Sequence, residues 1–169
     1  MEGTLIYVVG CNHGIQPIDL DVCDTPQTLE QRVHFRELVT QIIKENNQFV
    51  GEEWGYPTMT VAHAATDENG KIPWANINTS NEELDSMKIP GDYVNGGYPA
   101  EHTERWHRQR EQVMMKKITE QKGNAEQFVI ICGFEHMQPL RDSLRKICKS
   151  VESVDYRTMN WYDKNAFPD

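Results

Sequence analysis

Residues 127–136 read QFVIICGFEH, and this stretch contains the clearest buried strand in the sequence. Its first six residues are almost continuously apolar, which is typical of a strand covered on both faces. Residues 4–10, TLIYVVG, have the same character near the start of the chain. Strands of this kind occur mainly in the parallel sheets of α/β proteins. The two stretches therefore predict a buried parallel sheet.

Helical patterns separate the expected strands. Asp24-Thr25-Pro26 combines a capping side chain with a proline in the first turn, so it predicts a helix start, and apolar residues recur at helical spacing to about residue 45. A strand over 48–53 then completes a strand–helix–strand unit with parallel pairing. Further along the chain we expect a short helix over 58–65, a strand over 72–78, a long helix over 100–121, a helix that begins at Pro139, and a strand over 151–156.

This order predicts one layered α/β domain over residues 1–169. We expect a mostly parallel sheet of about four to five strands with helices on both faces. Residues 80–100 show no clear period and are predicted to form a long loop or flap, a kind of segment that is often functional.

The composition excludes several classes of protein. With 38% hydrophobic and 25% charged residues, the chain is too apolar for a disordered protein. The net charge of −9 argues against nucleic acid as a partner, because phosphate binding needs clustered Lys and Arg. We find no signal peptide and no apolar run of about 20 residues, so we expect a soluble, cytoplasmic protein without a membrane segment. None of the four cysteines forms a C-x-x-C pair, and Cys11 and Cys132 are expected to behave as small buried hydrophobes.

Two of the expected strands end in the same way. The first ends Gly10-Cys11-Asn12-His13, and the later one ends Gly133-Phe134-Glu135-His136, each followed by an expected loop towards a helix. The strand over 48–53 brings Glu52 and Glu53 to the same edge, where ligands bind in open α/β sheets. A Gly-x-x-His string arises easily by chance and loop histidines are commonly solvated, but its repetition after two buried strands favours a site. Two histidines and a glutamate suit either a metal site or an acid–base pair.

Arg110 is the cation whose position on its helix points to this site. It lies near the middle of the apolar face of the helix expected over 100–121, so it needs a fixed anion such as Glu52, Glu53 or a ligand. Strand alternation sends one glutamate to each face, and we expect one to face the site and the other a cation. Lys117 lies at the same angle around the helix axis as Arg110. Its simpler interpretation is a side chain whose charged end extends to solvent. We expect Arg105 and Arg108 to lie on the surface. His107, three residues before Arg110, is also expected on the surface, with a supporting position behind the site residues as the alternative.

The ordered motifs resemble those of a known group of proteins. The motifs are GCNHG (10–14), VGEEWG (50–55), REQVMMKKI (110–118) and VIICGFEHMQPL (129–140). Together they resemble the TraB and Tiki metalloprotease superfamily, with the erythromycin esterases and the ChaN haem-binding proteins as more distant members. The resemblance implies an α/β fold with one pocket lined by His13, one of the two glutamates, Arg110 and His136. It also implies hydrolysis, with a divalent metal in some branches and without one in others.

Three hypotheses follow. The first is a small esterase-like or peptidase-like hydrolase of a small-molecule or peptide substrate, in which a glutamate or histidine activates water directly or through a divalent metal on His13, Glu53 and His136. Arg110 would hold the carboxylate or stabilise developing negative charge. The second is a non-catalytic binding module for a small anionic ligand, haem or a protein partner. The third is a structural interaction protein in which the histidines are incidental. The sequence has no G-x-S-x-G, phosphate-binding glycine loop or H-E-x-x-H motif that would select another class.

Overall fold

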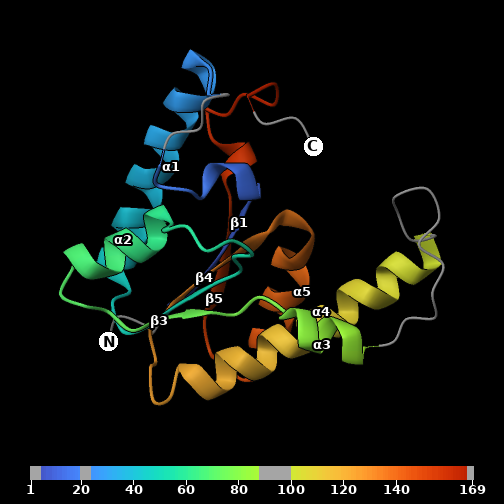
Figure 1. Ribbon diagram of the computed structural model, residues 1–169. Coiled ribbons are helices and arrows are strands. Elements are labelled where there is room, and N and C mark those ends of the chain that lie inside the picture. The colour runs from blue at the N-terminus through green and yellow to red at the C-terminus, as the bar shows by residue number, and fades with distance from the viewer. Residues whose placement is uncertain (1–4, 20–23, 88–99, 167–169) are drawn as a thin grey trace.

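Five parallel strands form the centre of the protein in the computed structural model, which describes residues 5–19, 24–87 and 100–166 (Figure 1). The sheet has the strand order β3-β2-β4-β1-β5. Its members are β1 (Ile6–Cys11), β2 (Val50–Glu52), β3 (Trp74–Asn76), β4 (Val129–Gly133) and β5 (Val151–Asp155). The predicted α/β fold with a parallel sheet is therefore confirmed, and β4 is the central strand, with β2 and β1 on either side of it.

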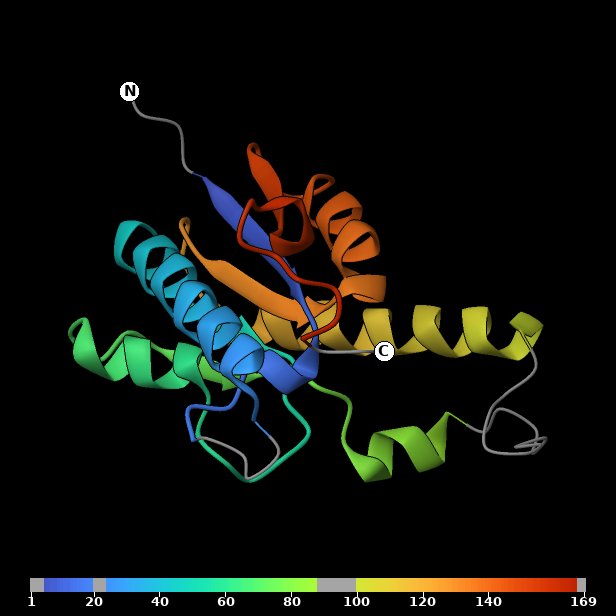
Figure 2. The same cartoon turned by 90° about the horizontal axis from the view of Figure 1, so that it is seen from above.

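Two pairs of helices cover the two faces of the sheet. On one face α1 (Pro26–Glu45) and α2 (Val61–Glu68) pack against alternate residues of the strands, such as Val9 and Ile131. On the other face α4 (Ala100–Gln121) and α5 (Phe134–Leu144) pack against the intervening residues, such as Val8 and Ile130. Period-2 alternation thus splits each apolar run between two cores. Figure 2 shows that α4 also extends well beyond the sheet at its N-terminal end.

Gly10 allows α5 to lie close to β1. A Cβ atom at this position would come within 2.7 Å of the Met137 sulfur and 3.1 Å of the Phe134 ring. The close approach places the first turn of α5 directly over the carboxyl end of β1, and this turn includes His136. Glycine at the end of the first apolar run therefore helps to position the site.

The structure corrects the predicted boundaries of three elements. The short helix begins after the cap Thr60 rather than at 58 and continues through Glu68. The predicted loop over 80–100 contains α3 (Asn81–Ser86), which begins with a capping box in which Ser80 and Glu83 satisfy each other's backbone N–H groups. Residues 88–99 of that prediction lie outside the described residues.

The third correction changes the setting of His136. Helix α5 begins at Phe134 and contains Pro139 in its interior, so no loop separates the strand from the helix. The sequence favoured a start at Pro139 because proline is common in the first helical turn. His136 and Glu135 consequently lie in the first turn of α5, on a rigid element.

Cys11 and Cys132 are fully buried on opposite faces of the sheet, in the two separate cores. Burial raises the pKa of both thiols well above the usual value. Their predicted behaviour as small hydrophobes is confirmed. Among the helices of the described ranges, none has the length and apolar character needed to span a bilayer.

Candidate functional site

Glu53 lies at the centre of the candidate site, directly after β2, and its side chain is only 1% exposed. Its Oε1 atom lies 2.5 Å from Nη2 of Arg110, and its Oε2 atom accepts a hydrogen bond of 2.8 Å from the backbone N–H of Gly133. Gly133 is the N-cap of α5, where the positive end of the helix dipole favours an anion. A guanidinium, a backbone N–H and a helix N-terminus together explain how this carboxylate is accommodated inside the protein.

Both predicted histidines converge on the same carboxylate. The Nε2 atom of His136 lies 3.7 Å from Oε1 of Glu53, and that of His13 lies 3.9 Å from it. These distances exceed hydrogen-bond length, so they describe rings that face the carboxylate across a gap. The structure thus brings together His13, Glu53, Arg110 and His136 from four separate segments of the chain.

His136 has an unusual environment for a histidine. It is fully buried, and its Nδ1 atom lies 3.0 Å from Oε1 of Glu111 on α4. Its Nε2 atom has no hydrogen-bond partner within the described part of the chain. Buried polar atoms are rarely left without a partner, and exceptions often occur where a ligand, water or ion binds.

Glu52 faces away from this group of residues, into a different environment. Its carboxylate accepts hydrogen bonds from three neutral donors, at 2.8 Å from Gln16, 2.5 Å from Thr60 and 3.0 Å from the Trp74 indole. Glu53, the other glutamate, contacts both the cation and the histidines. The expectation that one glutamate faces the site and the other a cation is therefore wrong: one residue does both, because Arg110 itself lies at the site.

Burial raises the pKa of Glu52, and the three hydrogen bonds only partly offset this effect. An acid with a raised pKa holds its proton more tightly in the folded state. The stabilisation that this group provides is therefore present at and below about pH 4.5, which is the pKa of the glutamate in the unfolded chain. It is lost as the pH rises towards the folded pKa.

A Glu52→Leu variant should reveal this linkage. Leucine leaves the hydroxyl of Thr60 and the indole N–H of Trp74 without their hydrogen-bond acceptor, at a cost of about 1–3 kcal/mol for each donor. It also removes a carboxylate whose ionisation in the interior is unfavourable. We expect the loss of unfolding free energy in urea titrations to be largest near pH 4.5 and to shrink as the pH rises. A loss that grew with rising pH would contradict this account, and the exposed Glu120→Leu provides the control.

The site opens to solvent on one side. His13 is 41% exposed and Glu135 is 48% exposed, whereas Glu53 and His136 lie beneath them. Burial by itself raises the pKa of Glu135, but a hydrogen bond from its own backbone N–H, together with positive charge on His136, His13 and His107 when these are protonated, outweighs burial, so the pKa is lowered. Glu135 is therefore a charged group at the mouth of the site.

His107 also borders the site. Its ring centroid lies 5.0 Å from that of His136, and the residue is half-buried, so the alternative of a supporting position beside the site agrees with the structure better than the expected surface position. Burial lowers the pKa of His107. His107 is consequently a neutral ring that walls the site at physiological pH.

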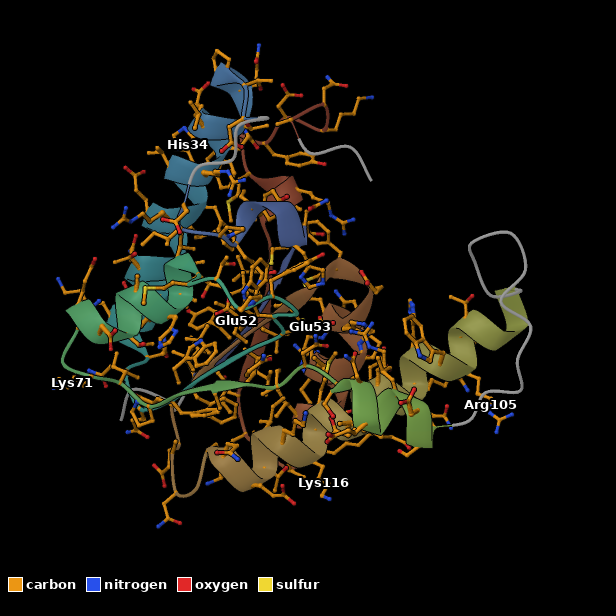
Figure 3. The ribbon with its side chains drawn as sticks, viewed as in Figure 1. His34, Glu52, Glu53, Lys71, Arg105 and Lys116 are labelled. Carbon is orange, nitrogen blue, oxygen red and sulfur yellow. The ribbon has the colours of Figure 1, made fainter. Side chains whose placement is uncertain are left out.

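Other charged residues lie away from the site, as Figure 3 shows for Arg105, Lys116 and His34. Arg108 is 71% exposed and pairs with the surface residue Glu104, so the predicted surface position is confirmed. Lys117 binds the backbone carbonyl of Asn78 and the carboxylate of Glu83. It is a structural cation that holds α3 against α4, rather than a side chain extended into solvent.

Sequence reasoning missed the residues that hold the site in place. Glu111 follows Arg110 directly, and Gln16 follows His13 by three positions, but neither belongs to a pattern that points to catalysis. Gln16 is fully buried and contacts both glutamates and His13. The sequence shows only that each of them is a polar residue near a predicted site residue, and such neighbours are too common in proteins to be informative.

Comparison with protein-family models, curated proteins and solved structures finds no match to this chain. The resemblance to the TraB and Tiki group remains a prediction from the motifs.

Proposed function

We propose that this protein is a small hydrolase in which His136 activates a water molecule beside Glu53. The observation that carries the proposal is the fully buried Nε2 atom of His136, which has no hydrogen-bond partner among the described residues and faces Glu53 across 3.7 Å. A neutral imidazole nitrogen with a free lone pair can take a proton from water. The water oxygen then bonds to an acyl or phosphoryl centre, and the leaving group departs with the electron pair of the broken bond and takes up that proton.

The other residues have distinct roles in this proposal. Arg110 orients Glu53 through the contact of 2.5 Å and also donates to Asn78 at 3.1 Å. Its remaining N–H groups supply donors for negative charge that develops on the substrate. His13, at the solvent-exposed mouth, contacts the substrate or the water. Glu52 has a supporting role, because its contacts are all with neutral side chains.

The motif resemblance raises the question of a divalent metal on His13, Glu53 and His136. The donor atoms suit such an ion, since two imidazole nitrogens and a carboxylate oxygen form common metal sites. Their separations of 3.7 and 3.9 Å are wider than the roughly 3–3.5 Å between ligands of one ion. In the described ranges no group of three or more His, Cys, Asp or Glu side chains is already arranged to hold a metal ion, and His13, Glu53 and His136 are the residues that would hold one. A bound ion would supply a water with a lowered pKa.

A cytoplasmic location is also part of the proposal. Cys11, Cys132 and Cys148 carry free thiols, which is usual for proteins of reducing compartments. The predicted substrate is a small molecule or a peptide, which would approach Glu53 and His136 past the exposed side chains of His13 and Glu135.

Turnover measurements test the proposal. Wild type and a His13→Ala/His136→Ala double variant should be offered a panel of ester, amide and phosphoester substrates, with and without a chelator. We expect wild type to hydrolyse one class and the double variant to be inactive. Elemental analysis of both proteins reports whether an ion is held by the two histidines. Equal turnover by both proteins would overturn the proposal. Ligand binding without turnover would instead indicate the binding-module hypothesis, with a small anionic ligand, haem or a protein partner.

A further inference from the structure

The Nδ1 atoms of both site histidines are hydrogen-bonded, and the partners determine where the ring protons lie. His136 Nδ1 lies 3.0 Å from a carboxylate oxygen of Glu111. A carboxylate accepts hydrogen bonds, so this contact requires a proton on Nδ1 of the imidazole. In the neutral ring the Nε2 atom is then the unprotonated one. This is the nitrogen that faces Glu53.

Gln16 determines the tautomer of His13 through the hydrogen bonds of its side-chain amide. Its Oε1 atom lies 2.6 Å from Nδ1 of His13, while its Nε2 atom donates to the Glu52 carboxylate at 2.8 Å and to the Glu53 backbone carbonyl at 3.2 Å. Amide orientations are assigned from hydrogen-bond networks, and here the network leaves one choice. A carbonyl oxygen can only accept, so the NH₂ group must face Glu53 and the amide oxygen must face His13. Nδ1 of His13 therefore carries the proton as well.

We propose that Glu111 and Gln16 are positioning residues that hold His136 and His13 in the Nδ1–H tautomer, so that both present an Nε2 lone pair at Oε1 of Glu53. The two histidines are far apart in the sequence, yet their Nε2 atoms lie 3.7 Å (His136) and 3.9 Å (His13) from the same oxygen. Partners of this kind on the far nitrogen of a histidine fix the tautomer and the orientation of the ring. The importance of the tautomers for catalysis rests on the proposed function; the tautomers themselves do not.

This arrangement defines the kind of group that the site accepts. Two Nε2 lone pairs and a carboxylate oxygen are all acceptors, and Glu135 adds another carboxylate 3.9 Å from Nε2 of His136. A complementary ligand must therefore donate hydrogen bonds at this point, as water, a hydroxyl group or an ammonium group does. The neighbouring donors are Arg110, which is held by Glu53, and His107 at the wall.

Nuclear magnetic resonance of the full chain labelled with ¹⁵N histidine tests the proposal without any activity measurement. Long-range ¹H–¹⁵N correlations at neutral pH distinguish protonated from unprotonated ring nitrogens. We expect His136 and His13 of the wild type to show a protonated Nδ1 and an unprotonated Nε2. A protonated Nε2 on either ring would overturn the proposal for that ring, and this result is independent of whether any substrate is hydrolysed.

Matched variants separate positioning from a general structural effect. Glu111→Met removes the acceptor and should shift His136 to a mixture of tautomers, while Glu111→Gln, which keeps an acceptor oxygen, should restore the wild-type pattern. Gln16→Met should affect His13 in the same way. Glu104→Met, on the exposed side of the same helix, should leave both rings unchanged. An unchanged His136 signal in Glu111→Met would assign Glu111 no role in the tautomer. Loss of folding in these variants would leave the wild-type spectrum as the deciding measurement.

Discussion

An Arg110→Ala variant is expected to lose about 3–5 kcal/mol of unfolding free energy, because it leaves a buried carboxylate without its counter-ion. Glu53 is 1% exposed and Arg110 is 13% exposed, so water solvates the carboxylate less well than the guanidinium does. The Gly133 N–H contact remains in the variant and keeps the loss within this range. Equilibrium unfolding in urea, monitored by tryptophan fluorescence and by circular dichroism, measures the change.

Arg108→Ala is the matched control for this prediction. It removes the same side chain from the same helix, but its partner Glu104 is 67% exposed, and exposed pairs contribute about 0–1 kcal/mol. Adding Glu53→Gln to Arg110→Ala removes the unpaired charge and should recover part of the loss. An Arg110→Ala protein as stable as wild type would show that Glu53 does not depend on its ion pair.

A His136→Asn variant should lower turnover of the substrate class identified in the panel by about 10²–10⁴-fold, the usual contribution of a general base. Asparagine can place an N–H near the position of Nδ1, so the hydrogen bond to Glu111 is retained while the Nε2 atom is lost. Stability should therefore change much less than activity. The kcat should fall in proportion to kcat/KM if His136 acts mainly on the reacting water.

His34→Asn serves as the control for this second prediction. His34 lies on α1, far from Glu53 in Figure 3, and its contacts are with the surface acids Glu30 and Glu37 and with Trp161. It should keep wild-type turnover. A His136→Asn protein that is folded and fully active would exclude His136 as the base, and His13→Asn would then be the next variant to measure.

The main elements of the fold could be read from short segments of the chain. The apolar runs at 4–10 and 127–132 and the helical spacing after Pro26 depend only on neighbouring residues. The errors occurred where two local signals compete. Proline at 139 favoured a helix start, although Phe134 begins the helix and Pro139 lies within it. Residues 80–86 lack an apolar period, but the capping box of Ser80 and Glu83 stabilises a short helix there.

The candidate site was only partly accessible in the same way. Placing His13, His136 and the glutamates at one edge required only that parallel strands end on the same side of the sheet. The sequence could not show which of Glu52 and Glu53 faces the histidines, because adjacent residues of a strand point to opposite faces and the sequence does not identify the face of the site. Glu111 and Gln16 were missed because their importance depends on which ring nitrogen they contact.

Contiguous residues were enough to predict a parallel α/β sheet and the edge of that sheet where polar side chains gather, since apolar periodicity and strand ends are local properties of the chain. The tertiary structure alone decided which carboxylate is the centre of the site and which nitrogens face it. The reason is the separation along the chain: Glu53 is 57 residues from Arg110 and 80 from the Gly133 N–H. Contacts over such separations arise only when the strands and helices pack, and they fix the environment of each ionisable group.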